Sequence, residues 1–301
     1  MTLAALAAAA LLAIAVPHVL PLRRADPVTA CLLWGAALAL RALLVVGAVA
    51  AALLLLHPAR LLEAAEQWSC APKHRIGAHA AAALGGIALT ASFLYALARV
   101  AQAALAVRRL VRNPLGAGPA GSLIVGGDGV VLAAAGLWRP RLLVSAGALT
   151  QLDDAELRVA IAHEQAHIRR GHRWALLYAE ACRVLGRPLP GTARAVHELR
   201  LHIERDADRS AVRDRPERLA LASAIVKAAA VPAAQAGMVL LAGDGAVARV
   251  RELLDAEDVS GSTRLLARAA AVLVLLVAAV AVFALPGELG SIGEEAAELC
   301  A

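Results

Sequence analysis

Residues 163–167 read His-Glu-Gln-Ala-His, the HExxH pattern, and the interpretation of the chain starts from them. Two histidines four residues apart lie one turn apart on the same face of a helix, so His163 and His167 can bind one zinc ion. Glu164 projects at the edge of that face, where it can act as a general base toward a water molecule. Zinc lowers the pKa of such a water to about 7. The pattern therefore predicts a catalytic zinc centre rather than two solvated histidines.

The surrounding sequence predicts that this motif lies on one long helix, Asp153–Leu185. Asp153 or Asp154 can cap the start of the helix, and Gly186 and Pro188 end it. A motif on a long amphipathic helix is much more specific than the same five letters in a loop, because the helix holds both imidazoles on one face.

A catalytic zinc site also needs a third protein ligand. One known arrangement, HExxHxxGxxH, would require glycine at position 170 and histidine at position 173, but the chain has Arg170 and Arg173. The alternative is a glutamate on a second helix, and Thr192–Arg213 predicts such a helix. Within it Glu204 is placed to ligate the metal. Asp208, one turn later, is placed to accept the second ring N–H of a ligand histidine.

Short strands are predicted before the motif helix. Ser122–Val125 and Val130–Ala134 predict a hairpin around residues 126–129, and Arg141–Ser145 predicts a further strand. We expect part of the last strand to form a sheet edge that binds the substrate backbone by β-addition, against the alternative of an ordinary core strand. The residues of that part are Leu142, Leu143, Val144 and Ser145.

A further side chain is expected opposite the metal, where it would stabilise the oxyanion. His197 is the first candidate because it lies seven residues before Glu204 on the same helical face. The alternative is that His197 is a surface residue, since histidines are frequent in this region. The remaining candidates are His172, His202, Arg249 and Arg251.

The composition is that of a membrane protein. Of the 301 residues, 60% are hydrophobic and only 18% are charged, fewer than a soluble domain of this length carries. Arg41 lies inside one of the apolar runs. We interpret its side chain as reaching the lipid headgroups, which leaves Ala42–Leu56 in hydrocarbon. The alternative is that Arg41 is a functional charge inside the membrane. Four runs are long enough for a bilayer core of about 30 Å. They are residues 1–22, 28–56, 76–98 and 265–286.

The arginines indicate the topology. The net charge is +6, and because arginines cluster at the ends of apolar runs, the positive-inside rule explains it better than a nucleic-acid partner. Arg23 and Arg24 follow the first run, which predicts an uncleaved span with its N-terminus outside. Residues 99–264 then form a cytoplasmic domain, whereas residues 57–75 and the tail 287–301 lie outside.

The cysteines fit this topology in two ways. Cys70 and Cys300 would both lie on the oxidising outer side, where a disulfide between them and two unpaired thiols remain equal alternatives. Cys31 and Cys182 would lie inside and stay reduced.

The HExxH…ExxAD pair, inserted between the third and fourth predicted spans, resembles that of the BlaR/MecR-type antibiotic-sensor membrane metallopeptidases. HtpX-type and CAAX prenyl proteases share the zinc motif. Residues 136–145 (GLWRPRLLVS) and residues 167–172 (HIRRGH) are also similar to that family around its motif helix. The resemblance implies a mainly α, four-span transmembrane helical protein with a cytoplasmic, zincin-like α+β metallopeptidase domain. It implies one zinc ion per chain, held by His163, His167 and Glu204.

The resemblance also implies a function. The protein would be a zinc-dependent endopeptidase of the bacterial cytoplasmic membrane that cleaves a cytoplasmic transcriptional repressor, a BlaI-like winged-helix protein, in signal transduction. Its partners would be this protein substrate and the lipid bilayer, with no direct nucleic-acid contact; self-association into a homo-oligomer is left open. The alternatives are a housekeeping quality-control protease and a non-catalytic membrane adaptor. Only residues 287–301 follow the fourth predicted span, so we expect no penicillin-binding sensor domain.

Overall fold

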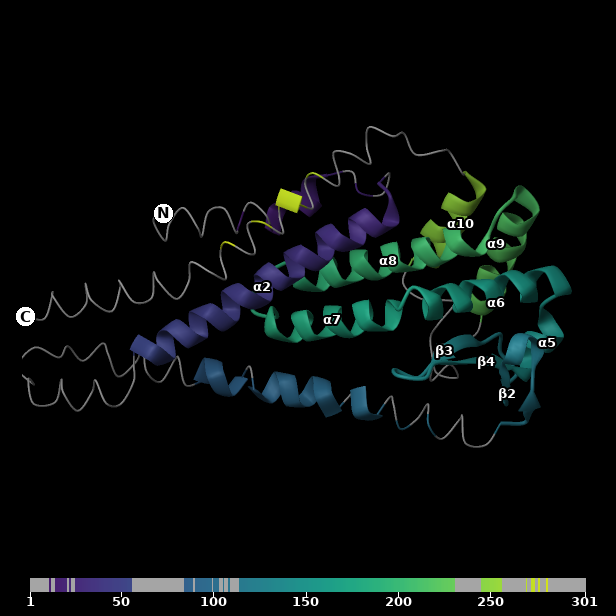
Figure 1. The fold of residues 1–301 in the computed structure, drawn as a ribbon, viewed down its shortest axis with the longest axis horizontal. Coiled ribbons are helices and arrows are strands. Elements are labelled where there is room, and N and C mark those ends of the chain that lie inside the picture. The colour runs from purple at the N-terminus through teal and green to yellow at the C-terminus, as the bar shows by residue number, and fades with distance from the viewer. Residues whose placement is uncertain are drawn as a thin grey trace, which may run out of the picture.

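The computed structural model describes residues 25–55, 114–230 and 245–255 continuously. It also describes most of residues 14–22 and 84–102, with single positions at 11, 105, 108, 269, 272, 273, 276 and 280. Figure 1 draws these parts as ribbons. The predictions for residues 57–75, the tail 287–301, Cys70 and Cys300 lie outside the described residues, as does most of the fourth predicted span. Cys31 and Cys182, which the structure does describe, form no disulfide.

Two of the described helices are long and apolar enough to cross a membrane, Pro27–Val49 and Leu84–Gln102. The first belongs to α2 (Pro27–Leu55), which agrees with the predicted run 28–56. Asp26 caps α2, because its carboxylate accepts hydrogen bonds from the backbone N–H and the hydroxyl of Thr29. Half of the residues in the most apolar stretch of α2 are buried by other parts of the protein, whereas none of those in the corresponding stretch of Leu84–Gln102 are.

The N-terminal half of α2 is buried by α7 (His172–Leu185) and α8 (Thr192–Ala211). Figure 1 shows these three helices side by side. They form one hydrophobic core, in which Leu33, Leu38 and Leu199 are almost fully buried. Helices α7 and α8 are therefore packed directly onto an apolar helix.

Arg41 does not reach outward from α2 as predicted. Only 2% of its surface is exposed, and its guanidinium contacts His18 Nε2 at 2.9 Å and donates to the carbonyl of Ala37. The turn between α7 and α8 covers it, because Gly186 and Gly191 both lie against its side chain. The charge is thus enclosed by the protein, and among the described residues Nε of the guanidinium has no hydrogen-bond partner.

The sheet has the order β1-β2-β4-β3, formed by β1 (Gly116–Ala117), β2 (Leu123–Val125), β3 (Leu132–Ala135) and β4 (Arg141–Ser145). Strand β4 pairs parallel with β2 on one side and antiparallel with β3 on the other. The predicted hairpin of residues 122–134 is therefore wrong, since β4 lies between its two strands.

The loop at residues 126–129 explains this difference. It crosses the end of β4: the carbonyl of Gly127 accepts from Gly147 N at 2.8 Å, and the carbonyl of Gly129 accepts from Ser145 Oγ at 2.6 Å. The glycines therefore form a crossover instead of a tight turn. The same order shows that Leu142–Ser145 is not an edge strand, because β3 occupies the edge.

The predicted helix 153–185 is two helices. The first is α6 (Asp154–Arg169), which begins at a capping box between Asp153 and Glu156. Gly171 then adopts a left-handed conformation, with φ of 67°, and ends the regular path before α7 begins. This break leaves α6 over the sheet and sends α7 along α2.

The remaining helices complete a second hydrophobic core beneath the sheet. They are α5 (Ala146–Gln151), α9 (Arg215–Ala229) and α10 (Ala246–Leu254). Val144, Val159, Ile225 and Leu253 meet in this core.

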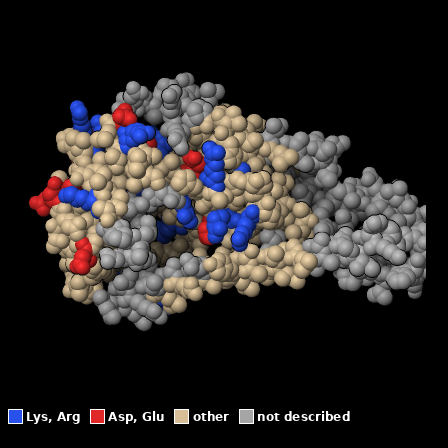
Figure 2. All heavy atoms as spheres, turned by 180° about the vertical axis from the view of Figure 1, so that it is seen from behind, with Lys and Arg blue, Asp and Glu red and all other residues tan. Residues whose placement is uncertain are grey.

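On the face shown in Figure 2, charged side chains lie over part of the described surface, and the described surface next to the large grey region at the right is uncharged.

Gly147→Ala is expected to destabilise the protein strongly. A Cβ at position 147 would lie only 2.2 Å from the carbonyl oxygen of Asp128, so the crossover loop would have to move off β4. Thermal unfolding in detergent measures the change. Gly116→Ala is the control, because nothing lies within 4 Å of its added Cβ. Equal unfolding temperatures for the two variants would contradict the crossover.

Candidate metal centre

Helices α6 and α8 bring together the three side chains that the sequence predicted as metal ligands. His163 and His167 lie on successive turns of α6, and Glu204 faces them from α8. His163 Nε2 lies 3.1 Å from His167 Nε2 and 3.5 Å from Glu204 Oε2, and His167 Nε2 lies 3.6 Å from Glu204 Oε1. The two imidazole nitrogens and the carboxylate group of Glu204 thus form a compact cluster, called the ligand triangle below.

The size of this triangle fits zinc. Ligand atoms 2.0–2.1 Å from a tetrahedral zinc ion lie about 3.3–3.4 Å from one another, and the three observed distances bracket this value. The donor set is also suitable, since zinc accepts imidazole nitrogen and carboxylate oxygen. Among the described residues three side chains converge in this way, so a zinc ion held by them would keep a fourth position for water or substrate.

Asp208 orients His163. Its Oδ1 lies 2.9 Å from Nδ1 of the imidazole, so Nε2 is left to face Glu204 and the metal position. Burial by itself lowers the pKa of His163, but the carboxylates of Asp208 and Glu204 outweigh it and raise the pKa to about 9. His163 therefore has to release a proton when Nε2 binds a metal ion.

Arg249 supplies the positive charge that keeps the carboxylates ionised. Its fully buried guanidinium contacts both oxygens of Asp208, at 2.6 and 2.8 Å, and lies 2.9 Å from Glu204 Oε2. Burial by itself raises the pKa of Asp208, but Arg249 and His163 reverse the effect and hold this pKa below its usual value. The pKa of Glu204 is lowered in the same way.

A second chain of contacts orients His167. Its Nδ1 lies 3.0 Å from Nδ1 of His172, and Nε2 of His172 lies 3.0 Å from Asp206 Oδ2. Arg170 adds an ion pair to the same carboxylate oxygen at 3.1 Å. Burial lowers the pKa of His167 to about 3, which favours the neutral imidazole that a metal requires. Each ligand histidine therefore has its own carboxylate partner, directly or through His172.

Glu164 lies between the ligand triangle and the edge of the sheet. It is 3% exposed, and its Oε2 accepts a hydrogen bond from Ala134 N of β3 at 2.9 Å. Burial raises the pKa of Glu164 to about 7. A carboxylate with such a pKa can both take up and release a proton near neutral pH, as a general base must.

The other predicted site residues are placed elsewhere. His197 lies seven residues before Glu204, about 10 Å along α8, and it is exposed on a cavity with Glu180 and Arg200. It is therefore not at the ligand triangle. Leu142, Leu143, Val144 and Ser145 are buried inside the sheet, and the hydroxyl of Ser145 is used to cap α5.

The sequence prediction did not include Ala134 or Asp206, and it named His172 and Arg249 only as alternatives for the oxyanion role. The sequence does contain a signal for His172. A glycine such as Gly171 is typical of a helix end, where the chain changes direction and can bring the next side chain back toward the helix. Arg249 was only one of several alternatives, since no local pattern connects α10 to α8.

One comparison with known proteins gives a match that covers the segment carrying this site. Residues 132–248 match the family model of the BlaR1 peptidase M56, so the resemblance seen in the sequence is confirmed over this segment. The matched segment begins at β3, contains all three ligand residues and Asp208, and stops one residue before Arg249. No curated protein and no solved structure gives a significant match.

His172→Ala is expected to weaken zinc binding by roughly 10- to 100-fold, the usual effect of losing an outer partner of a ligand histidine. The physical reason is that His167 Nδ1 loses the contact that orients its ring. Competition with a chelator measures the affinity. His197→Ala is the control, and an equal loss in both variants would contradict the role given to His172.

Arg249→Met is expected to lower the free energy of unfolding by about 3–5 kcal/mol, because it leaves the buried carboxylate of Asp208 and the partly buried one of Glu204 without their cation. The loss should be smaller with zinc present, since a metal ion supplies positive charge beside the same carboxylates. Chemical denaturation with and without zinc measures both effects. Arg251→Met, an exposed position on the same helix, is the matched control.

Proposed function

We propose that this chain, which matches the BlaR1 peptidase M56 family over residues 132–248, is a membrane-embedded zinc-dependent endopeptidase. The observation that carries the proposal is the spacing of 3.1–3.6 Å among the two imidazole nitrogens and the carboxylate oxygens of Glu204, beside a buried glutamate at a sheet edge. A zinc peptidase needs a metal position and a general base close together, because both must reach the same water molecule and the same peptide bond.

The residues would divide the chemistry as follows. His163, His167 and Glu204 hold the zinc ion, which when bound acts as a Lewis acid and lowers the pKa of the attacking water. Glu164 takes the proton from that water and delivers it to the leaving amine. Asp208 and the His172–Asp206 pair hold the two imidazoles in the orientation and tautomer that ligation requires.

Strand β3 is the surface on which a peptide would bind. Val131 O accepts from Ser145 N of β4, so alternation along the strand turns the amide groups of Leu132 and Ala134 toward the free edge. Ala134 N already donates to Glu164 there. A substrate strand added along β3 would therefore pass the base, which is the arrangement that β-addition requires. This role replaces the one predicted for β4.

The cytoplasmic orientation, the signalling role and the substrate are part of the proposal. Two described helices that are long and apolar enough to span a bilayer support a membrane location. The family resemblance supports a cytoplasmic repressor of the BlaI-like winged-helix type as the substrate. A housekeeping protease would share the same site and differ in accepting unfolded proteins in general.

Glu164→Gln is expected to abolish peptide-bond cleavage while zinc binding is kept, because the variant loses the base and no metal ligand. Wild type and variant are purified in detergent with zinc and incubated with casein and with a BlaI-like repressor. Loss of at least 100-fold in rate is the expected result for one general base. Cleavage of the repressor alone supports the signalling role, whereas cleavage of casein supports the housekeeping alternative.

Equal cleavage by wild type and Glu164→Gln would contradict the proposal. The non-catalytic adaptor would be favoured by a different set of results. In that case the wild-type protein binds zinc but cleaves neither substrate, and Glu164→Gln leaves its effect in the cell unchanged.

A further inference from the structure

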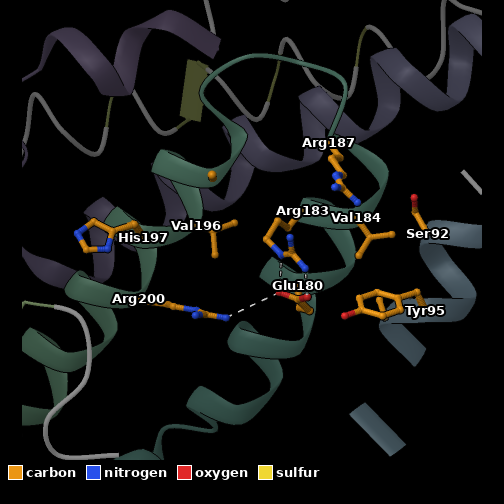
Figure 3. Close-up of a pocket in the computed structure, with 11 residues that line it drawn as sticks. Ser92, Tyr95, Glu180, Arg183, Val184, Arg187, Val196, His197 and Arg200 are labelled. Carbon is orange, nitrogen blue, oxygen red and sulfur yellow. Dashed lines mark hydrogen bonds and ion pairs between the residues drawn. The ribbon is translucent and has the colours of Figure 1, made fainter. Parts of the chain in front are cut away.

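A cavity of about 600 Å³ lies away from the ligand triangle, between the end of α7, the start of α8 and the helix Leu84–Gln102. Figure 3 shows Arg183 and Glu180 on α7, Arg200 and His197 on α8, and Tyr95 with Ser92 on the third helix. The cavity therefore lies between α7, α8 and a helix that is long and apolar enough to span a membrane.

The cavity is cationic. Glu180 forms an ion pair with Arg183, whose Nε lies 2.8 Å away, and a longer one with Arg200 at 3.7 Å. The hydrogen bond from Arg183 lowers the pKa of Glu180, so this carboxylate is ionised. Within the part of the chain that the structure describes, no carboxylate pairs with Arg187. Three guanidinium groups and one carboxylate leave a net charge of +2 in the lining.

The position of the cavity along the two apolar helices is also defined. Arg187 follows Gly186, which lies against the side chain of Arg41 and the backbone of Ala42. Beyond this point α2 continues without a charged residue to Leu55. The other apolar helix, Leu84–Gln102, contributes Ser92 and Tyr95 to the lining. The cavity thus lies beside two helices that are long and apolar enough to span a membrane.

The surface next to the cavity is apolar and exposed. Phe93, Leu94 and Leu97 neighbour the cavity residues on the same helix and are 47–58% exposed. Such a row of large apolar side chains is suited to acyl chains. Tyr95, 63% exposed, has the aromatic ring and hydroxyl that are typical of the membrane interface.

We propose that this cavity binds the phosphate group of an anionic phospholipid in the leaflet next to the catalytic region. Guanidinium groups bind phosphate oxygens through paired, charge-assisted hydrogen bonds, and Arg187 and Arg200 offer such groups on two sides of the cavity. A basic pocket beside membrane helices is the setting in which lipid headgroups are recognised. A soluble phosphate has the same charge, but only a lipid also covers Phe93 and Leu97. The inference does not depend on the proposed peptidase activity.

The test is a lipid titration of the full-length protein in detergent, followed by native mass spectrometry. Phosphatidylglycerol is compared with the zwitterionic phosphatidylcholine. The double variant Arg187→Gln/Arg200→Gln removes two cavity charges, and Arg213→Gln/Arg215→Gln removes two exposed charges at the turn between α8 and α9. We expect wild type and the control variant to bind phosphatidylglycerol preferentially, and the cavity variant to bind it about tenfold more weakly.

Two further measurements keep the outcome decisive. We expect both variants to unfold at temperatures close to that of wild type, because the four substituted arginines are exposed. Inorganic phosphate and glycerol phosphate, added in large excess, are expected not to displace the lipid. Equal lipid binding by both variants would overturn the proposal. Displacement by soluble phosphate at lipid-like concentrations, or arginine-dependent binding of an acidic peptide in place of lipid, would overturn it as well.

Discussion

The packing of α6 against α8 is the contact on which the site depends. Each helix alone carries an ordinary row of polar residues at a spacing of four. Only their contact places two imidazoles and one carboxylate within 3.6 Å of one another. Both helices are held from outside: α6 lies on the sheet and α9, whereas α8 lies on α2 and α7. The metal position is therefore at the junction of the two hydrophobic cores.

Burying this many charges is costly unless they are paired. The protein meets the cost with two chains of contacts that run outward from the ligand histidines. One passes from His163 through Asp208 to Arg249, and the other from His167 through His172 to Asp206. The first chain ties α10 to the site, and the second ties the α6–α7 break to α8. The same residues thus stabilise the fold and orient the ligands.

Local patterns in the sequence were enough to predict that His163, His167 and Glu204 come together from two helices. A spacing of four residues indicates the shared face on both helices, and a capping aspartate marks the start of α6, whereas the break at Gly171 was not predicted. The strand order could not be predicted, because the crossover at residues 126–129 depends on contacts with β4 and α5. For the same reason the substrate edge was assigned to β4 instead of β3. Arg249 was not singled out because its partners lie 41 and 45 residues away in the sequence.

We propose that His163, His167 and Glu204 form one zinc site beside helices with the length and composition of membrane spans. X-ray absorption at the zinc edge, together with metal analysis of the purified full-length protein, tests this proposal. We expect one zinc ion per chain with only nitrogen and oxygen neighbours at about 2.0–2.2 Å, two of them imidazoles. Glu204→Ala should lose the ion. The proposal is wrong if protein purified in the presence of zinc contains none, or if the bound zinc has sulfur ligands.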